Sequence, residues 1–413
     1  MTPPRDIEQI TYLDRELVAI IQDFHLLAPL SWPIEAQRVF LDAAKKGDMV
    51  LPEVSFEKQD CYDKIHILRS YIKKLGKDAH PAITFLRDTA ESYLIAYYIL
   101  QGAGTSAVTE CSQMLYGSPG QKAGGYQRSN LQVAKYFLRV VDQYQRTVRD
   151  EPLIYGAQEF CQLLQTRVWE WIDPERDPIS ITVDERITAR AASGPNYVKI
   201  RHDARFSEAD VMQMLHHEVF THTLTYINGR KQPVLSCMGY SSPRITATQE
   251  GLAVFGEYVN FSIELVRLKR IALRIVALDM ASKGANLIEL YQFFKKHGQN
   301  TEESYYSSMR TFRGGFPKGG IVFYKDNVYI RGLIEVEGFL KQAMHRGLVH
   351  DIALLFAGKL TTGDVISMTP LIELGYIIPP SYIPKWASRS GELAAHLAFN
   401  DITERFKLKK TSQ

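Results

Sequence analysis

The amino-acid sequence predicts a predominantly helical α+β protein. Apolar residues recur at helical spacing through most of the first 150 residues. The period changes to strand-like alternation at residues 179–183 and 197–200, which predicts a small β-sheet. Helical spacing then returns in two long segments, 207–227 and 248–283. Helices on both sides of a short stretch of strands therefore define the expected fold class.

The composition is that of an ordinary globular protein. The chain has 413 residues, of which 45% are apolar and 23% charged, and its formal net charge is +3. This length can bury a sizeable core and allows two or three domains. Lysine and arginine number 49 against 46 aspartates and glutamates. Such a near balance argues against nucleic acid as a partner.

Three features predict a cytoplasmic location. Asp6 and Glu8 lie where a signal peptide would be apolar. No apolar run reaches the roughly 18 residues that suggest a membrane span, so we expect no membrane partner. The cysteines are few and form no CxxC pair, which favours reduced thiols, although two disulfides with three connectivities stay open. These cysteines are Cys61, Cys111, Cys161 and Cys237.

The N-terminal part is expected to be helical. Helical spacing marks residues 7–27, 36–45, 60–75, 82–101 and 130–149. The glycines of Gly117-Ser-Pro-Gly120 and Gly124-Gly125 mark a loop between two of these helices. A charged turn, Arg149-Asp-Glu-Pro152, predicts a boundary between a helical N-terminal region (1–150) and a second domain (151–413). Alternatively, the N-terminal helices pack onto the rest as one unit.

The second part combines the strands with further helices. Ser207 and Asp210 fit a capping box at the start of the 207–227 helix, and Gly229 is a plausible stop. Residues 314–332 are rich in glycine, with a strand-like centre at 321–324. The most apolar helical stretch, residues 254–281, is interrupted by charges that include Arg267, Arg270 and Arg274. The expected helices are 158–171, 207–227, 248–283 and 287–297.

The 207–227 helix carries a candidate metal motif, His217-Glu-Val-Phe-Thr-His222. In the common HExxH pattern the histidines lie four positions apart and face one ion. Here they lie five positions apart, which places the side chains about 140° from each other around an α-helix. Both can reach one metal only with a π-bulge, an unwound last turn or a helix that ends before His222. On spacing alone, a zinc site and a buried hydrogen-bonded histidine pair are about equally favoured.

Glu250 supplies a candidate third ligand, 28 residues after His222. It lies near the start of the 248–283 helix, where Thr246 or Thr248 is a plausible cap. Two histidines and a glutamate would complete a zinc set with one open position. Gly251 and Ala253 are small enough to let another backbone or a substrate approach, and Glu257 could hold a ligand histidine or be a solvated charge.

These motifs together resemble a known family. His217-Glu-Val-Phe-Thr-His222 with Thr248-Gln-Glu-Gly-Leu-Ala253 is similar to the QEGLA-motif proteins, which carry HExxTH and then QEGLA. The family includes bacterial members and the microtubule-associated tyrosine carboxypeptidases of eukaryotes, and the chain is identified as a bacterial-type member. Arg313-Gly-Gly-Phe-Pro-Lys-Gly-Gly320 and Tyr329-x-x-Gly332 also resemble it. The resemblance covers about residues 150–370.

The resemblance implies a zinc metallocarboxypeptidase that removes the last residue of a peptide or protein C-terminal tail, with tyrosine as the residue that the family's characterised members remove. His217, His222 and Glu250 match the ligands of one Zn²⁺, and Glu218 matches the catalytic glutamate, a general base toward a zinc-activated water. Phe220 stands where the family usually has glycine. The chain shows no obvious microtubule-binding extension, which makes tubulin a doubtful substrate.

Further roles follow from what such chemistry needs. Tyr329 is a candidate donor to the oxyanion, although a core or strand tyrosine is the more common case. Arg310 and Arg313 are candidates to bind the terminal carboxylate, because arginine holds carboxylates with two parallel hydrogen bonds. Lys318 and Lys325 are weaker candidates for this role, and a solvated surface charge is the ordinary alternative for each cation. His216 points about 100° away from His217 and is expected in the core or behind the ligands.

Two other functions stay open. A non-enzymatic regulatory or scaffolding protein would hold a structural or vestigial zinc, with four protein ligands and no open position. A zinc hydrolase that acts on non-peptide amides would use the same ligands and the same base. The substrate, the preferred terminal residue, the oligomeric state and the role of the N-terminal helices are not readable from the sequence.

Overall fold

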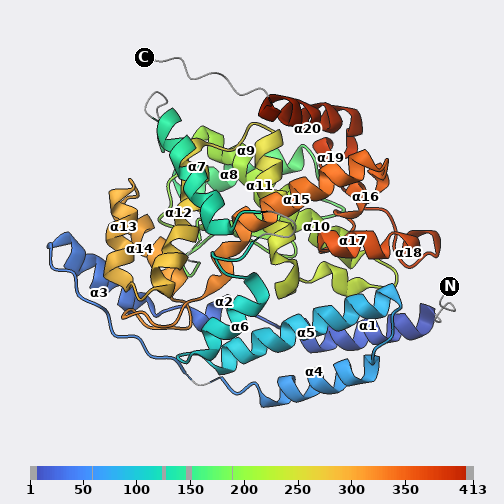
Figure 1. Cartoon of the computed structure of the whole chain (residues 1–413), viewed down its shortest axis with the longest axis horizontal. Coiled ribbons are helices and arrows are strands. Elements are labelled where there is room, and N and C mark those ends of the chain that lie inside the picture. Colours follow the sequence, from blue (N-terminus) through green and yellow to red (C-terminus); the bar gives the residue numbers. More distant parts are fainter. Residues whose placement is uncertain (1–6, 58, 123–126, 146–150, 188, 406–413) are drawn as a thin grey trace.

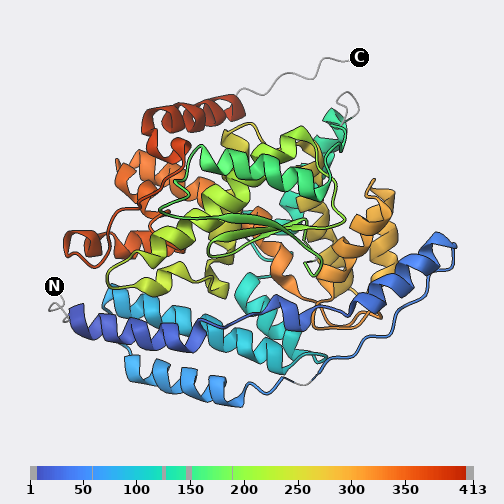
Figure 2. The same ribbon diagram turned by 180° about the vertical axis from the view of Figure 1, so that it is seen from behind.

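The fold is mostly helical around one small sheet, so the predicted α+β class is confirmed. The computed structural model describes residues 7–57, 59–122, 127–145, 151–187 and 189–405. Helices from the N-terminal third lie along the lower edge in Figure 1, and the C-terminal helices lie at the upper right. Figure 2, from behind, shows the sheet near the middle of the molecule.

The N-terminal helices follow the predicted ranges closely. Helices α1, α4 and α5 lie side by side (Figure 1). The segment 7–27 is helical only to Ile21, and helix α6 was not predicted from the sequence. The end of the predicted 130–149 helix falls at residues 146–149, outside the described residues. The bounds are α1 (Ile7–Ile21), α2 (Leu27–Leu30), α3 (Ile34–Lys45), α4 (Tyr62–Leu75), α5 (Pro81–Gln101), α6 (Ala107–Tyr116) and α7 (Asn130–Tyr144).

The hydrophobic core joins these helices to the second half of the chain. One continuous cluster of buried apolar side chains runs from Ile10 to Leu397. On α1, the buried carboxylate of Asp14 accepts hydrogen bonds from the backbone amides of Ser236 and Cys237, each at 2.9 Å. The charged turn predicted as a boundary includes residues 149 and 150, outside the described part. The division at residue 150 stays a prediction.

The strands that the structure describes form a three-stranded sheet in the order β1-β3-β2. Strands β1 (Ser180–Asp184) and β3 (Tyr197–Arg201) are parallel, with Ile181 opposite Val198. Both were predicted. The antiparallel strand β2 (Ala191–Ser193) is too short to show an alternating pattern. Helix α8 (Ala157–Trp169) packs against β1, and a second apolar cluster fills the space between this helix, the sheet and the metal-motif helix.

The metal motif lies in a rod made of α9 (Glu208–Met214), a π-helix η1 (Leu215–Thr223) and α10 (Leu224–Arg230). The rod begins at the predicted capping box, where Ser207 and Asp210 each bind the other's backbone amide. Gly229 does not stop the rod, because it lies within the last turn. A Cβ at this position would come 2.4 Å from the carbonyl oxygen of Met238, so the glycine permits a close backbone contact.

The predicted 248–283 helix is two helices, α11 (Thr246–Val259) and α12 (Leu265–Ser282). The chain turns between them at Phe261, whose φ is 54° and whose side chain is 95% exposed. Asparagine or glycine usually marks such a left-handed residue, so a phenylalanine gives no break signal. Neither threonine caps α11. The Thr246 hydroxyl donates to the Pro243 carbonyl, and the Thr248 hydroxyl accepts from the Thr362 amide.

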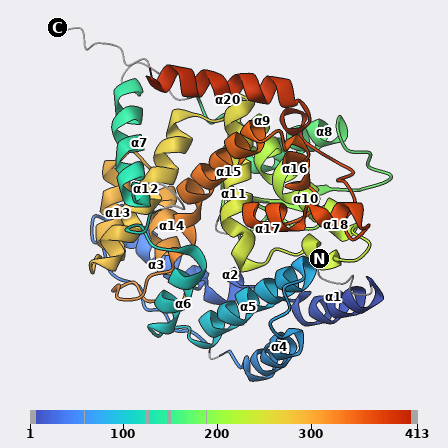
Figure 3. The same cartoon turned by 45° about the vertical axis from the view of Figure 1, so that its right-hand side comes forward.

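Helix α11 crosses helix α15 (Val328–His345) at two glycines. Figure 3 shows the crossing. A Cβ on Gly251 would lie 2.2 Å from the Gly332 backbone, and a Cβ on Gly332 would lie 1.8 Å from the Ala247 carbonyl oxygen. The small residue of the QEGLA motif therefore admits another backbone, as the sequence suggested. The predicted strand at residues 321–324 is wrong: this stretch is irregular and leads into the helical turn η4 (Tyr324–Asn327).

The remaining elements surround this centre. These remaining elements are η2 (Ser236–Gly239), η3 (Pro243–Ile245), α13 (Leu287–Lys296), α14 (Thr301–Thr311), α16 (Val349–Leu354), α17 (Thr362–Met368), α18 (Pro370–Glu373), α19 (Lys385–Ser388) and α20 (Ser390–Arg405). No helix in the described part of the chain is long and apolar enough to cross a membrane.

Candidate metal centre

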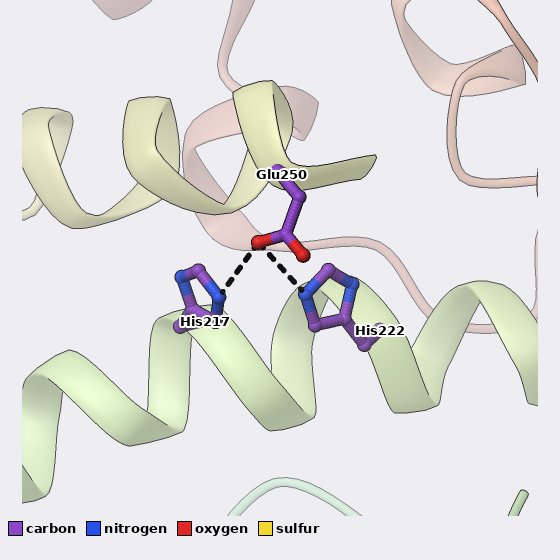
Figure 4. A group of neighbouring side chains, drawn as sticks. All are labelled: His217, His222 and Glu250. Atoms are coloured by element: carbon purple, nitrogen blue, oxygen red, sulfur yellow. Dashed lines mark ion pairs between the residues drawn. The ribbon is translucent and has the colours of Figure 1, made fainter. Parts of the chain in front are cut away.

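The three candidate ligands converge on one point. One ligand atom from each of His217, His222 and Glu250 lies within 4.8 Å of the other two. Glu250 Oε2 is 3.4 Å from His217 Nε2 and 3.9 Å from His222 Nε2. Figure 4 shows both histidines rising from η1 and the carboxylate reaching toward them from α11. The structure therefore brings together the residues that the motifs singled out.

The π-helix explains the five-residue spacing. Its hydrogen bonds join residue i to residue i+5, so side chains five positions apart stand one above the other. Side chains support the widened turns: the Thr221 hydroxyl donates to the His216 carbonyl at 3.0 Å, and the Thr223 hydroxyl donates to the Glu218 carbonyl at 3.1 Å. Of the three geometries that the sequence left open, the π-type distortion is the one observed.

A buried carboxylate orients His217. His217 Nδ1 lies 2.6 Å from Glu257 Oε1, so this nitrogen donates and Nε2 is left to face the ligand cluster. Glu257 is fully buried and is held in turn by Gln213 Nε2 at 2.9 Å and Arg267 Nη2 at 3.1 Å. Of the two roles considered for Glu257, the structure shows the partner of a ligand histidine.

An amide takes the corresponding place behind His222. His222 Nδ1 lies 3.4 Å from Gln249 Oε1, the residue before the ligand Glu250. The Thr225 hydroxyl donates to the same oxygen at 2.9 Å, and Lys359 Nζ donates to it at 3.2 Å. The two ligand histidines therefore have different supports, a carboxylate for His217 and a neutral amide for His222.

The electrostatic potential at the cluster favours positive charge. Burial disfavours a charged His217 ring, but the neighbouring carboxylates of Glu250 and Glu257 outweigh burial and raise the pKa of His217 to about 10. Burial lowers the pKa of His222 to about 4, although Glu250 acts in the opposite direction. Burial would raise the pKa of Glu250, but Lys325 and the two histidines hold it well below its ordinary value. The carboxylate is therefore ionised and available to a cation.

The donor set fits a zinc ion. Ligands about 2.1 Å from a tetrahedral ion lie about 3.4 Å from one another, close to the observed separations from Glu250 Oε2. Within the described residues this oxygen is buried and accepts no hydrogen bond, which is costly for a carboxylate without another partner. The other oxygen of Glu250 lies 3.5 Å from Lys325 Nζ.

A small pocket of about 70 Å³ opens beside His217 and Glu218. Glu218 is 8% exposed, and its Oε1 lies 4.0 Å from His217 Nε2, so it adjoins the ligands without belonging to their cluster. The pocket is lined by Ala189, Arg190, Ala191, Arg201, Gln213, Met214, His217, Glu218, Arg267, Arg270, Arg274, Glu303, Tyr306, Ser307, Arg310 and Tyr329.

Arginines give this pocket an unbalanced positive wall. Arg310 Nε donates to Asp326 at 2.9 Å, and other lining arginines pair with acids in the same way. Among the described residues, Nε of Arg270 and Nε of Arg274 have no hydrogen-bond partner. Burial and the neighbouring cation Arg267 lower the pKa of Arg270 to about 9. An anion in the pocket would relieve this repulsion.

The other predicted residues are scattered around the site. Tyr329 is buried on α15 and lines the pocket, near the guanidinium groups of Arg267 and Arg274. Arg310 lines the pocket, whereas Arg313 is buried elsewhere and does not. Lys318 is exposed and stacks on Phe316.

Two neighbours of the ligands point into the apolar core. His216 and Phe220 are buried, and their rings contact each other edge to face at 5.4 Å. Phe220 also contacts Trp171, in the cluster between η1 and α8. His216 is therefore a core residue, in line with the sequence analysis. The bulky Phe220 packs against the layer behind the metal helix.

Sequence reasoning missed several residues of the site. Arg267, Arg270 and Arg274 are spaced three and four apart, which places them on one face of α12. That spacing is visible in the sequence, but from the sequence these charges were interpreted only as interruptions of an apolar stretch. Gln249 lies inside the QEGLA motif and received no role. Lys359 follows an apolar run and carries no pattern that could have marked it.

Comparison with known proteins agrees with this geometry. A family model described as microtubule-associated tyrosine carboxypeptidase matches residues 40–405. No curated protein matches the chain. The matched range includes the histidine motif, the QEGLA motif, the glycine-rich segment and most of the N-terminal helices. It extends well beyond the roughly 150–370 range over which the resemblance was read from the motifs. The chain therefore belongs to the microtubule-associated tyrosine carboxypeptidase family, a family of peptidases.

Proposed function

We propose that the protein is a zinc-dependent metallocarboxypeptidase. The observation that carries the proposal is the convergence of His217, His222 and Glu250 on one point, with Glu218 beside them at an arginine-lined pocket. Three protein ligands leave one position open, which is typical of catalytic rather than structural zinc. The open position argues against the alternative of a scaffolding protein with a closed metal site.

Zinc held by these ligands would supply an activated water molecule and would polarise the carbonyl of the scissile bond. The carboxylate of Glu218 accepts the proton of the attacking water and then delivers it to the nitrogen of the leaving amino acid. Glu218 is buried, and its Oε1 lies 4.0 Å from Nε2 of the proposed ligand His217. Glu257 keeps His217 in the tautomer that presents Nε2 to the ion.

The pocket is suited to the terminal carboxylate that distinguishes a carboxypeptidase substrate. Among the described residues, Nε of Arg270 and Nε of Arg274 make no hydrogen bond, although Arg274 Nε lies 3.8 Å from Asp326 Oδ2. Arg310 lines the same pocket and donates to Asp326. A carboxylate bound here would accept charge-assisted hydrogen bonds from this wall. The proposed carboxylate site therefore includes Arg310 from the sequence prediction, adds Arg270 and Arg274, and leaves out Arg313, which does not line the pocket.

Tyr329 is proposed as the donor to the tetrahedral oxyanion. It lines the same pocket as Glu218, and the Arg274 guanidinium lies 5.3 Å from its ring centre. A hydroxyl that donates to a developing negative charge accelerates acyl transfer. Replacement of Tyr329 by Phe should lower kcat about 10²–10³-fold and leave zinc content unchanged. Equal kcat in both proteins would remove this assignment.

The proposed substrate is the C-terminal tail of a peptide or protein. The description of the family makes a terminal tyrosine the first residue to test. We also propose a cytoplasmic location, which the four free cysteines support.

One comparison tests the proposed function. Purified wild type and Glu218→Gln are analysed for zinc and incubated with a proteome-derived peptide library, and C-terminal trimming is read by mass spectrometry. We expect about one zinc per chain in both proteins and trimming by wild type alone. C-terminally amidated peptides serve as the control and should stay intact. Absence of zinc from wild type, or trimming by Glu218→Gln, would contradict the proposal. Cleavage of the amidated peptides would favour a broader amide hydrolase.

A further inference from the structure

A buried lysine lies behind the second ligand histidine. Lys359 is 5% exposed and lies between α16 and α17, where its backbone amide donates to the Met238 carbonyl at 2.7 Å. Lysine is almost never buried to this extent unless its ammonium group is paired. The nitrogen Nζ donates to the His222 carbonyl at 3.0 Å and to Gln249 Oε1 at 3.2 Å, and lies 3.4 Å from the Thr225 hydroxyl. Each of these partners is either the main chain of His222 or a side chain that helps to hold its ring in place.

We infer that Lys359 is a positioning residue that holds Gln249 and the main chain at His222 so that this histidine presents Nε2 to the metal. The inference rests on the proposed zinc site. It assigns a function to a residue that belongs neither to the histidine motif nor to the QEGLA motif.

Lys359 fixes which way the Gln249 side-chain amide points. An ammonium group donates hydrogen bonds and accepts none, so the side that faces Lys359 must be the amide oxygen. The Thr225 hydroxyl donates to the same oxygen. His222 Nδ1 faces that oxygen too, and must therefore carry the proton. His222 Nε2 is then the unprotonated nitrogen that a metal ion requires.

The separation between His222 Nδ1 and Gln249 Oε1 makes the placement of Gln249 important. At 3.4 Å this contact is near the upper limit of a hydrogen bond, so a small shift of the amide would break it. The nitrogen of the Gln249 amide has no hydrogen-bond partner among the described residues and cannot hold the group. Thr225 and Lys359 both lie within hydrogen-bond distance of this oxygen and of the His222 carbonyl. The Thr225 hydroxyl has a single proton and also faces the Thr221 carbonyl at 2.7 Å, whereas Lys359 Nζ can donate to both oxygens at once.

The side chains that hold His217 are arranged in the same way as those that hold His222, but with a carboxylate in place of an amide. There a buried cation, Arg267, holds the oxygen of Glu257, and that oxygen accepts from His217 Nδ1. Behind His222, the buried cation Lys359 holds the oxygen of Gln249. Each ligand histidine is therefore fixed through an oxygen that a buried cation anchors. Partners of this kind commonly contribute about 10–100-fold to metal affinity.

The test measures zinc affinity rather than turnover. Dissociation constants are obtained by competition with a chelator, for wild type and Lys359→Met, and the visible absorption of the cobalt(II) forms reports the ligand geometry. We expect zinc binding to weaken about 10–100-fold in Lys359→Met, with an altered cobalt spectrum. Lys359→Arg keeps N–H donors and should restore most of the affinity. Lys341→Met removes a lysine that pairs with Glu337 and Asp401 instead, and should bind zinc like wild type.

The outcomes separate this inference from the proposed function. If wild type binds no zinc, the proposed function fails. If wild type binds zinc and Lys359→Met binds within about threefold of it, the inference about Lys359 is overturned; the same holds if Lys359→Arg is as weak as Lys359→Met. Should the methionine variant not fold, Lys359→Gln takes its place with the same expectation, because its shorter amide cannot reach Gln249 and His222 together.

Discussion

At the scale of single residues, the Glu257 carboxylate behind His217 should have the most direct effect on zinc affinity. Glu257→Gln keeps the shape of the side chain but removes the charge that His217 Nδ1 and Arg267 share. We expect zinc affinity to fall about 10–100-fold, because the basicity of the ligand depends on this partner. Chelator competition measures the change. Glu337→Gln, on the surface pair with Lys341, is the matched control and should leave the affinity unchanged.

A second residue, Asp210, makes the stability of the fold depend on pH through its hydrogen bonds at the start of the metal helix. Burial would raise the pKa of Asp210, but Arg190 and the Ser207 amide outweigh it and lower the pKa below its ordinary value. A lowered pKa means that the ionised carboxylate stabilises the fold above the ordinary aspartate pKa of about 3.9, and that this stability is lost as pH falls through the lowered pKa.

The corresponding variant is Asp210→Asn. At pH 7 it should lower the free energy of unfolding by about 1.5–3 kcal/mol, because charged hydrogen bonds are lost. The gap between the two proteins should begin to shrink below about pH 4, where the Asp210 carboxylate of the unfolded chain becomes protonated, and should close as pH falls through the lowered pKa of the folded protein. Urea unfolding followed by circular dichroism at pH 7 and pH 3 measures both values. Glu392→Gln, in an exposed pair with Arg389, should cost less than about 1 kcal/mol. A constant gap for Asp210→Asn at both pH values would count against the assignment.

At the scale of elements, two features position the ligands. The π-helix brings His217 and His222 onto one side of η1, and the contact of α11 with α15 sets where Glu250 stands. The second feature depends on the absence of a side chain at Gly251, one residue after the ligand. Any shift of α11 away from α15 would move the Glu250 carboxylate relative to the histidines.

The crossing can be tested with one methyl group. Gly251→Ala puts a Cβ where the Gly332 backbone lies 2.2 Å away, so the helices must separate. We expect a loss of at least about 1–3 kcal/mol in unfolding free energy, together with weaker zinc binding. Gly391→Ala, in helix α20 with no atom within 4 Å of the new Cβ, should be neutral or slightly stabilising. Equal effects of the two substitutions would show that the crossing tolerates a side chain.

At the scale of the whole molecule, the N-terminal helices and the metal centre share one core. Apolar contacts are continuous from α1 to α20. Asp14 also ties α1 to the segment that follows the metal helix, through the amides of Ser236 and Cys237. A core that crosses the predicted boundary favours unfolding as one unit.

We therefore expect a single cooperative transition on heating, with equal calorimetric and van't Hoff enthalpies. Asp14→Ala should lower the stability by about 1.5–3 kcal/mol, because the buried amides of Ser236 and Cys237 lose their acceptor. The transition should remain single, since the two parts still share their core. Scanning calorimetry of both proteins measures this. Two separate transitions in wild type would instead support independent domains divided near residue 150.

Local signals in the sequence were sufficient for the class of fold and most helices, and the two motifs named the candidate ligand set. Helical spacing predicted α3, α4, α5, α8 and α13 nearly to the residue, and the capping box at Ser207 marked the start of the metal helix. These features depend on neighbours within a few positions along the chain. The errors fell where local signals were weak or misleading: the turn at Phe261, the glycine inside the end of α10, and the segment 321–324.

The sequence by itself determined the candidates for the metal site: its two motifs single out His217, His222 and Glu250 as ligands, with Glu218 beside them. Only the tertiary structure decided how a five-residue spacing aims two histidines at one point, through the π-helix. Only it showed that Lys359 and the arginines of α12 surround that point. The physical reason is distance along the chain. Motifs record contacts between near neighbours, whereas Lys359 lies 137 residues from His222 and meets it only in the packed core.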